Sequence, residues 1–447
     1  MTVASRHTRS TRAGPDGSRR PTGAAAERAV PGLSGSAFRR IWAAAAISNL
    51  GDGIGLAALP LLVASLTKDP LLVAGAAAAL QLPWLVFALP SGGLVDRTDR
   101  RRAMVATDLI RTLLVGCLAL FVLAGEADIA LICVVSFALS TAETVFDPAS
   151  EAILPLVVES DSLAGANARL QGTTATLNYF VGPPIGAALF AVVAAAPFAL
   201  DAASFLASAL IVLTLAGSYR PHSERAAQPL LTEVRDGLSW LAHHPVLRYT
   251  SSLAGLTNIA TYAIVAILVL FAKQVLGLGD LGYGILLSAY GVGAIVGSLT
   301  AGMVIAAVHD AGALRISTWM GAAAAVICLG ITEPTVFGLA IAAFGFSGAL
   351  WNVAHVTLRQ RLVPDELRGR VAGANRLVTT GAMPVGAALG GVAATAFGLR
   401  APFVLAAILL VAGGIVALAR ITPAAIAAAR ADGASREDGS RVSRGDA

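Results

Sequence analysis

Apolar stretches long enough to cross a membrane follow one another along almost the whole chain, and short polar segments separate them. A membrane-spanning helix needs about 20 mostly apolar residues. By this measure the pattern predicts an all-α membrane protein with twelve transmembrane helices. The predicted spans lie near residues 41–66, 71–95, 103–124, 129–155, 168–193, 196–218, 249–273, 281–307, 314–332, 334–358, 371–397 and 400–420.

The spans form two sets of six on either side of the longest internal polar segment, 219–248. Apolar and charged residues alternate there at helical spacing, which predicts an amphipathic helix on the cytoplasmic membrane face. We expect six-helix bundles over 37–218 and 249–420. Residues 1–36 and 421–447 have little to bury, so they are predicted to be cytoplasmic tails, the first of them disordered.

Two short sequence matches relate these halves to each other. Residues 164–167 recur as 372–375, and 184–189 recur as 384–389 with Val in place of Ile at the second position. Both matches keep their order and lie around the fifth and eleventh spans. They predict two parallel six-helix repeats, related by an axis along the membrane normal.

Basic residues gather on one side of the predicted membrane. The loops of the other side hold only Lys68, Lys273 and Arg400. Because arginine and lysine in short loops favour the cytoplasm, both termini of this multi-pass protein are predicted to be cytoplasmic, in the plasma (inner) membrane. The cytoplasmic set is Arg97, Arg100, Arg101, Arg102, Arg169, Arg220, Arg225, Arg235, Arg248, Arg315, Arg359, Arg361, Arg368, Arg370 and Arg420.

Composition agrees with a membrane location and excludes several classes of function. The chain is 56% hydrophobic and only 13% charged, whereas soluble proteins carry about 25% charged residues. Its three cysteines lie in apolar runs and form no C-x-x-C motif. The sequence holds no metal cluster, nucleotide-binding loop or catalytic triad, so we expect no enzyme activity, no cofactor, no metal and no nucleic-acid partner.

A compact charged segment follows the second predicted span. Its pattern, G-x-x-x-D-R-x-x-R-R-R over residues 92–102, resembles the signature loop of the major facilitator superfamily of transporters. The resemblance implies that Asp96 docks at the start of the eleventh span and latches the halves together when the cytoplasmic side is closed. The implied latch residues are Gly92, Asp96, Arg97, Arg100 and Arg101. The alternative is that this segment is only a basic stop signal, which fixes the orientation of the protein in the membrane.

The fifth predicted span carries a second motif. Gly182, Pro183 and Gly186 resemble the G-P-x-x-G-G motif of proton-coupled drug antiporters, in which proline bends the helix and glycines allow close packing. Packing alone is the alternative role. Together with Phe146-Asp147-Pro148 and the segment 363–371, this span resembles the branch that contains the enterobactin exporter and the macrolide efflux proteins.

Ionisable residues inside the spans are costly and therefore candidates for function. We expect Asp52 to be the proton-coupling carboxyl group, with Glu143 as the second candidate. A structural hydrogen bond to a neighbouring helix is the alternative for Asp52. Asp108 and Arg111, three residues apart, are predicted to neutralise each other. Asp201 is predicted to cap the start of its helix.

Two further carboxylates, Asp147 and Glu151, lie nearer the cytoplasmic end of the fourth span. We expect them to bind Arg169 or arginines of the loops.

Aromatic and amide side chains on the central spans are candidates for cargo contact, because a mostly apolar cavity with a few polar groups suits amphiphilic organic molecules. Interhelical packing is the alternative for each of them, and a buried hydrogen bond for His355. The candidates are Gln81, Trp84, Asn178, Tyr179, Asn258, Tyr262, Tyr290, Trp351, Asn352 and His355.

Together these features predict a monomeric secondary transporter that exports a small amphiphilic compound, such as a drug, a macrolide or a siderophore, in exchange for protons. An importer or symporter on the same fold is the first alternative. The second is a non-transporting membrane sensor or scaffold, for which Asp96→Ala and Asp52→Asn would leave function intact.

Overall fold

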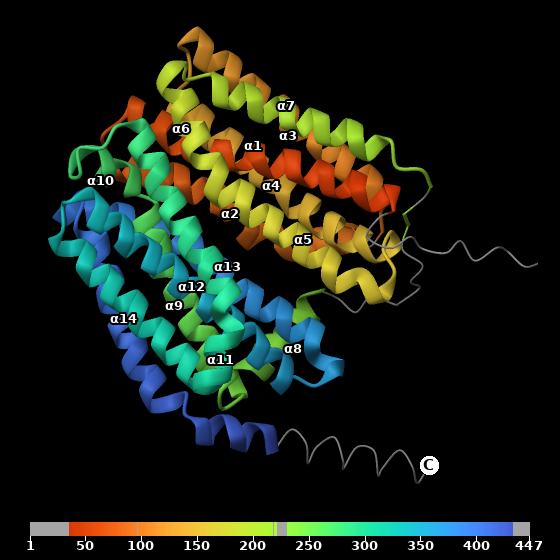
Figure 1. The fold of residues 1–447 in the computed structure, drawn as a ribbon, viewed down its shortest axis with the longest axis vertical. Helices are drawn as coiled ribbons and strands as arrows, with labels where there is room; N and C mark the ends of the chain where they lie inside the picture. The colour runs from red at the N-terminus through yellow and green to blue at the C-terminus, as the bar shows by residue number, and fades with distance from the viewer. Residues whose placement is uncertain (1–34, 96, 218, 221–229, 432–447) are drawn as a thin grey trace, which may run out of the picture.

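Helices make up nearly all of the chain that the computed structural model describes, which comprises residues 35–95, 97–217, 219–220 and 230–431 (Figure 1). The major helices of the first half are α1 (Ser36–Leu66), α2 (Pro70–Val95), α3 (Arg100–Ala124), α4 (Ile129–Ile153), α5 (Leu163–Thr176), α6 (Gly182–Val192) and α7 (Ala196–Leu213). They are followed by α8 (Leu230–His243), α9 (Leu247–Val265), α10 (Leu268–Gln274), α11 (Asp280–Gly330), α12 (Pro334–Leu362), α13 (Arg368–Phe397) and α14 (Ala401–Arg420).

Within the described ranges, eleven helical segments are long and apolar enough to cross a membrane. One of them, α11, has 51 residues, which would extend about 75 Å as a straight helix, more than twice the thickness of the hydrocarbon core. It is broken at His309, whose φ of 61° is not helical. The two arms of α11 are therefore separate crossings, and the predicted twelve-span fold is confirmed.

Acidic side chains fix the starts of several helices by accepting hydrogen bonds from free backbone N–H groups. Asp99 accepts from the N–H of Arg102 at 3.2 Å and begins α3, and Asp128 accepts from Leu131 at 2.7 Å and begins α4. Glu333 begins α12 and accepts from Val336 at 2.7 Å. This backbone bond lowers the pKa of the exposed Glu333 carboxyl group.

The helices pack as two related halves (Figure 1). In the N-terminal half, α1 contacts α5, α6 and α7, while α4 contacts α2 and α3. In the C-terminal half, α9 contacts α13 and α14, and α11 contacts α12 and α14. Equivalent arginines repeat one contact: Arg101 donates to the carbonyl of Leu213 at the end of α7, and Arg315 donates to that of Leu418, near the end of α14, at 3.0 Å. The repeat predicted from short sequence matches is thus visible in side-chain bonding.

Within the described residues, the buried apolar clusters that contain both halves lie toward one end of the molecule. A large core contains residues of both halves, among them Leu61, Phe190, Phe271 and Tyr283. All four lie toward the end at which α1 and α6 finish and α11 begins, here called the closed end. At the other end, here called the basic end because it carries residues 97–102, each half has its own core. The halves therefore separate toward the basic end.

The amphipathic helix predicted between the halves is α8, and it packs against the start of α13. Asp236 lies 3.7 Å from Arg370. Gly237 approaches so closely that a β-carbon there would meet the Arg370 carbonyl and the Ala374 side chain. Leu241 of α8 is buried in the core of the C-terminal half and Trp240 packs against that core, so the apolar side of α8 covers protein at the basic end.

The C-terminal segment contains structure that its polar composition did not predict. Residues 423–431 are helical, and Ile426 and Ala429 are buried against the C-terminal half. Arg430 donates to Asp310 at 2.6 Å. The predicted C-terminal tail thus begins with an ordered helix. Of the predicted disordered tail 1–36, residues 1–34 lie outside the described residues, and Ser36 already begins α1.

Candidate functional site

The fifth span lies between the two halves and is interrupted at its centre. It consists of α5, a π-helical turn at Leu177–Val181, and α6. At Gly182 a β-carbon would lie 2.6 Å from the Gly53 backbone, and at Gly186 it would collide with the carbonyl of Ile54. The predicted motif therefore brings this span into backbone contact with α1, directly beside Asp52. On its other side, Pro183 and Ala187 touch α11 at Gly284.

This contact predicts the effect of one added methyl group. We expect Gly186→Ala to destabilise the protein by about 1–3 kcal/mol, because the Ile54 backbone cannot move aside as a flexible side chain could. Gly172→Ala is the matched control, since a β-carbon at Gly172 in α5 would meet nothing within 4 Å. Thermal unfolding of the purified variants measures both. Equal melting temperatures for the two variants would contradict this account of the motif.

The π-helical turn directs Tyr179 toward the interface between the halves. Such turns are rare and frequent at functional sites. The Tyr179 hydroxyl group interacts electrostatically with Asp52, Glu143 and Asp147 of its own half. It also interacts with Tyr262, which in turn interacts with Tyr290. The structure thus brings together three of the predicted cargo-contact residues beside the predicted proton-coupling carboxyl groups.

A charged pair lies behind these carboxylates, inside the N-terminal half. Asp108 and Arg111 of α3 are 0% and 1% exposed, and their nearest oxygen and nitrogen are 3.7 Å apart. Ser208 of α7 donates to Asp108 at 2.7 Å. The Arg111 guanidinium lies over the rings of Phe146 at 4.5 Å and Phe205 at 5.2 Å. The predicted pair is present, but Arg111 has more partners than Asp108.

Arg111 is the shared electrostatic partner of carboxylates from three other helices, α1, α4 and α7. Asp52 of α1 and both Glu143 and Asp147 of α4 interact with it. Trp84 of α2 lies beside the Glu143 carboxyl group. Asp52 and Glu143 are half-buried, and Asp147 is exposed. These acids therefore form a row on the inner surface of the N-terminal half, with Arg111 behind them.

Asp201 belongs to the same charged cluster, and its predicted capping role is wrong. The cap position of α7 is Ala195, and Asp201 lies inside the helix with 3% exposure. Its carboxyl group fits against Gly51 and Gly55 of α1, where β-carbons would crowd it. It interacts electrostatically with Arg111. The two glycines on α1 thus make room for a buried acid.

Arg376 of α13 approaches this cluster from the C-terminal half and was absent from the sequence-based candidates. Its guanidinium carbon lies 5.1 Å from the centre of the Trp84 ring. It also interacts electrostatically with Asp147. The expectation that Asp147 binds Arg169 or a loop arginine is therefore wrong. An ionisable residue within the predicted span 371–397 was the signal that could have identified Arg376.

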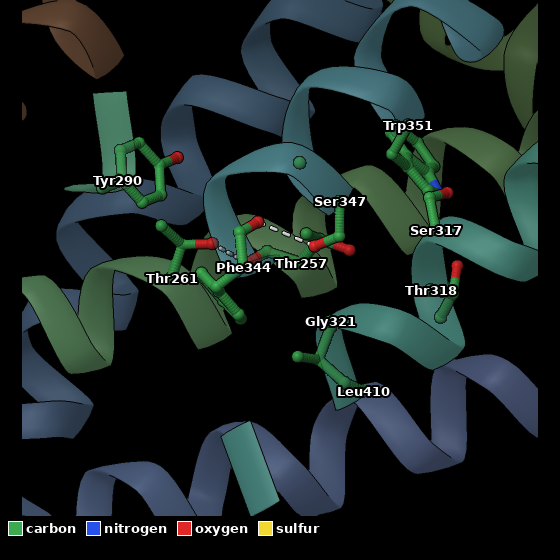
Figure 2. A pocket seen from close by; sticks show the side chains of 11 residues that line it. Thr257, Thr261, Tyr290, Ser317, Thr318, Gly321, Phe344, Ser347, Trp351 and Leu410 are labelled. Atoms are coloured by element: carbon green, nitrogen blue, oxygen red, sulfur yellow. Dashed lines mark hydrogen bonds between the residues drawn. The ribbon is translucent and has the colours of Figure 1, made fainter. Parts of the chain in front are cut away.

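A second polar region lies within the C-terminal half (Figure 2). It is a cavity of about 20 Å³, large enough for one water molecule, and Tyr290, Trp351, Thr257 and Ser347 are among its lining residues. Within the described residues, the buried Trp351 indole N–H and the Thr257 hydroxyl group have no hydrogen-bond partner. Unsatisfied polar groups around such a space are suited to hold water or a polar part of a ligand.

The remaining cargo-contact candidates are spread over several environments. His355 is buried, stacks on Trp351 at 4.8 Å and shares a 3.1 Å hydrogen bond with Asn375. Asn258 donates to the carbonyl of Thr379 at 2.8 Å. These contacts match the alternative of interhelical hydrogen bonding. Asn352 is exposed on α12, Gln81 lies half-buried on α2, and Asn178 is half-buried in the π-helical turn.

The predicted latch is only partly covered by the structure. Asp96 lies outside the described residues, and Gly92 lies within the last turn of α2. Arg97 is exposed, and the backbone N–H of Arg100 donates to the Tyr219 carbonyl at 3.4 Å. This bond, like the bond from Arg101 to the end of α7, joins this segment to other parts of the N-terminal half. The latch itself stays a prediction.

No group of three or more potential metal ligands occurs among the described residues. The charged cluster consists of carboxylates from separate helices with a guanidinium between them. Such an arrangement can exchange protons and attract cations.

Comparisons with known proteins place the chain among transporters. The chain is 29% identical to the multidrug efflux pump Tap of Mycolicibacterium fortuitum, over 84% of this chain and 93% of that protein. It is 30% identical to Tap of Mycobacterium tuberculosis, over 82% and 89% of the two chains. Macrolide efflux protein A of Streptococcus pyogenes is 25% identical, over 85% and 94%.

Solved structures share the fold at low sequence identity. The nucleoside transporter NupG (D323A mutant) superimposes with a TM-score of 0.71 at 12% identity, over 86% of this chain and 100% of that chain. A bacterial homologue of the iron transporter ferroportin, in the inward-facing state, gives 0.68 at 15% identity, over 86% and 98%. The family model described as "Transmembrane secretion effector" matches residues 28–437. The chain therefore belongs to the transmembrane secretion effector family of major facilitator transporters.

Proposed function

We propose that this transporter exports a small amphiphilic organic compound and that inward movement of protons drives the export. The observation that carries the proposal is the row of carboxylates, Asp52, Glu143 and Asp147, at the interface between the halves. Several carboxylates close together in a low-dielectric region cannot all remain charged. Their protons can therefore be taken up and released as the site changes its exposure.

The names of the relatives support the direction of transport. Tap is described as a multidrug efflux pump, and a second relative as a macrolide efflux protein. We infer that the cargo of this chain belongs to the same broad class of drug-like compounds. A siderophore stays a further candidate for the cargo.

The arginine asymmetry supports an orientation with the basic end in the cytoplasm of a plasma-membrane protein. In that orientation the described state is open to the inside, because the shared core closes the opposite end. Cargo would enter from the cytoplasm and reach the carboxylates while they are deprotonated. Closure of the basic end, with Asp96 as the latch, would then expose the site outward, where protonation releases the cargo. We propose that a single chain carries out this cycle.

Everted membrane vesicles test the proposal directly. With an acid interior, vesicles that contain the protein should accumulate a lipophilic drug or a macrolide, and a protonophore should abolish the uptake. Asp96→Ala should lower the rate about fivefold, since a latch contributes about 1 kcal/mol to the closed state. Vesicles without the protein are the control.

Two outcomes would favour the alternatives. Accumulation in right-side-out vesicles under an inward proton gradient, with none in everted vesicles, would indicate an importer. Unchanged phenotypes of Asp96→Ala and Asp52→Asn in a cell that depends on the protein would indicate a sensor or scaffold.

A further inference from the structure

Arg376 bridges the two halves at the acidic surface. Its guanidinium, on α13 of the C-terminal half, lies 5.1 Å from the centre of the Trp84 ring on α2 of the N-terminal half. It interacts electrostatically with Asp147 of α4, and Trp84 also contacts Glu143. An aromatic ring face beside carboxylates is an arrangement that attracts a cation.

The other cation of the cluster is already engaged. Arg111 is 1% exposed, lies behind the acidic row and forms an ion pair with Asp108. Asp52, Glu143 and Asp147 are more accessible than either member of that pair. The accessible surface around these three carboxylates is therefore acidic, and Arg376 is a positive charge supplied to it from the opposite half.

Arg376 is exposed, and its long side chain allows the guanidinium group to move. The same aromatic face and carboxylates would suit a bulky organic cation. A cation bound there would meet electrostatic repulsion from the guanidinium and would have to displace it from Trp84. Displacement would also remove a contact between the halves, so that binding would change the balance between states.

We propose that Arg376 occupies the cargo position of the empty transporter as a built-in cation, and that the cargo is an organic cation that displaces it. This inference rests on the proposed function, since it names the class of cargo and the residue that competes with it. Binding of the cargo would thus release the contact between Arg376 of α13 and Trp84 of α2.

An anionic cargo that uses Arg376 as its ligand is the opposing possibility. The geometry favours the cation, because an anion at the guanidinium would also face Asp147 and lie close to Glu143. Like charges repel, so these carboxylates would oppose an anion bound beside them.

Two probes of the same shape and opposite charge separate these possibilities. We suggest equilibrium binding of tetraphenylphosphonium and tetraphenylborate to the purified full-length protein in detergent. In Arg376→Gln, tetraphenylphosphonium should bind about tenfold tighter than in the wild type. Arg376→Lys keeps the positive charge and should stay close to wild-type affinity. Arg400→Gln removes a positive charge at the closed end and should also have no effect.

Equal or weaker binding of tetraphenylphosphonium to Arg376→Gln would overturn the proposal, as would failure of both wild type and variant to bind it. Preferential binding of tetraphenylborate that is lost in Arg376→Gln would instead identify an anion ligand. If the glutamine variant is not monodisperse, Arg376→Met can replace it and should likewise bind tetraphenylphosphonium more tightly than the wild type. Since binding needs no gradient, tighter binding to Arg376→Gln with no export in vesicles would contradict the proposed proton-driven export and leave the assignment of Arg376 intact.

Discussion

Proton-driven export should fall by roughly 100-fold or more in the Asp52→Asn variant, close to the level of vesicles that lack the protein. Asparagine has nearly the same shape and can still form hydrogen bonds, but it cannot take up or release a proton. The carboxyl group of Asp52 lies in the cluster around Arg111 and beside the close contact between α1 and the fifth span. Loss of its titration should therefore uncouple cargo movement from the gradient.

A second measurement distinguishes lost coupling from a damaged fold. Exchange of labelled for unlabelled cargo, without a gradient, should continue in Asp52→Asn because that process needs no net proton movement. Asp128→Asn is the matched control, since Asp128 caps α4 and asparagine caps a helix about equally well. If Asp52→Asn exports normally while Glu143→Gln fails, Glu143 is the coupling residue and the assignment of Asp52 is wrong.

Removal of the buried cation should have the largest effect on stability. We expect Arg111→Gln to lower the stability of the folded protein by about 3–5 kcal/mol, because it leaves Asp108 buried without its counter-ion. Asp108 is 0% exposed, and its described polar contacts are Ser208 and Arg111. Thermal unfolding in detergent, or the fraction that remains monodisperse after heating, measures the loss.

Neutralisation of the remaining acid should restore much of that stability. The double variant Asp108→Asn/Arg111→Gln carries no unpaired charge at this pair and should be more stable than Arg111→Gln alone. A double variant no more stable than Arg111→Gln would show that the stacking of Arg111 on Phe146 and Phe205 matters more than its charge.

The limits of sequence-based interpretation are clearest for single charged residues. Asp108 and Arg111 were paired correctly because three residues along a helix place two side chains on one face. The further partners of Arg111 come from α1, α4 and α7, and no local spacing relates those helices. Asp201 was misassigned for the same reason, since its role depends on two glycines of α1.

The position of Arg376 could not be predicted from the sequence for a different reason. It lies close to the basic residues that begin the eleventh span, and its position facing Trp84 depends on how the two halves meet. The cargo-contact candidates show the same dependence. Tyr179, Tyr262 and Tyr290 interact across the interface, whereas Asn258 and His355 make hydrogen bonds within the C-terminal half.

The amino-acid sequence by itself determined the membrane location, the twelve crossings and the two-fold repeat. Each of these follows from local hydrophobicity, from the thickness of the bilayer that a helix must cross, or from direct sequence matches. Only the tertiary structure decided which charges share one site, which end of the molecule is closed and where Arg376 lies. Those properties arise from contacts between helices far apart in the chain, where the low dielectric of the bundle makes the position of each charge decisive.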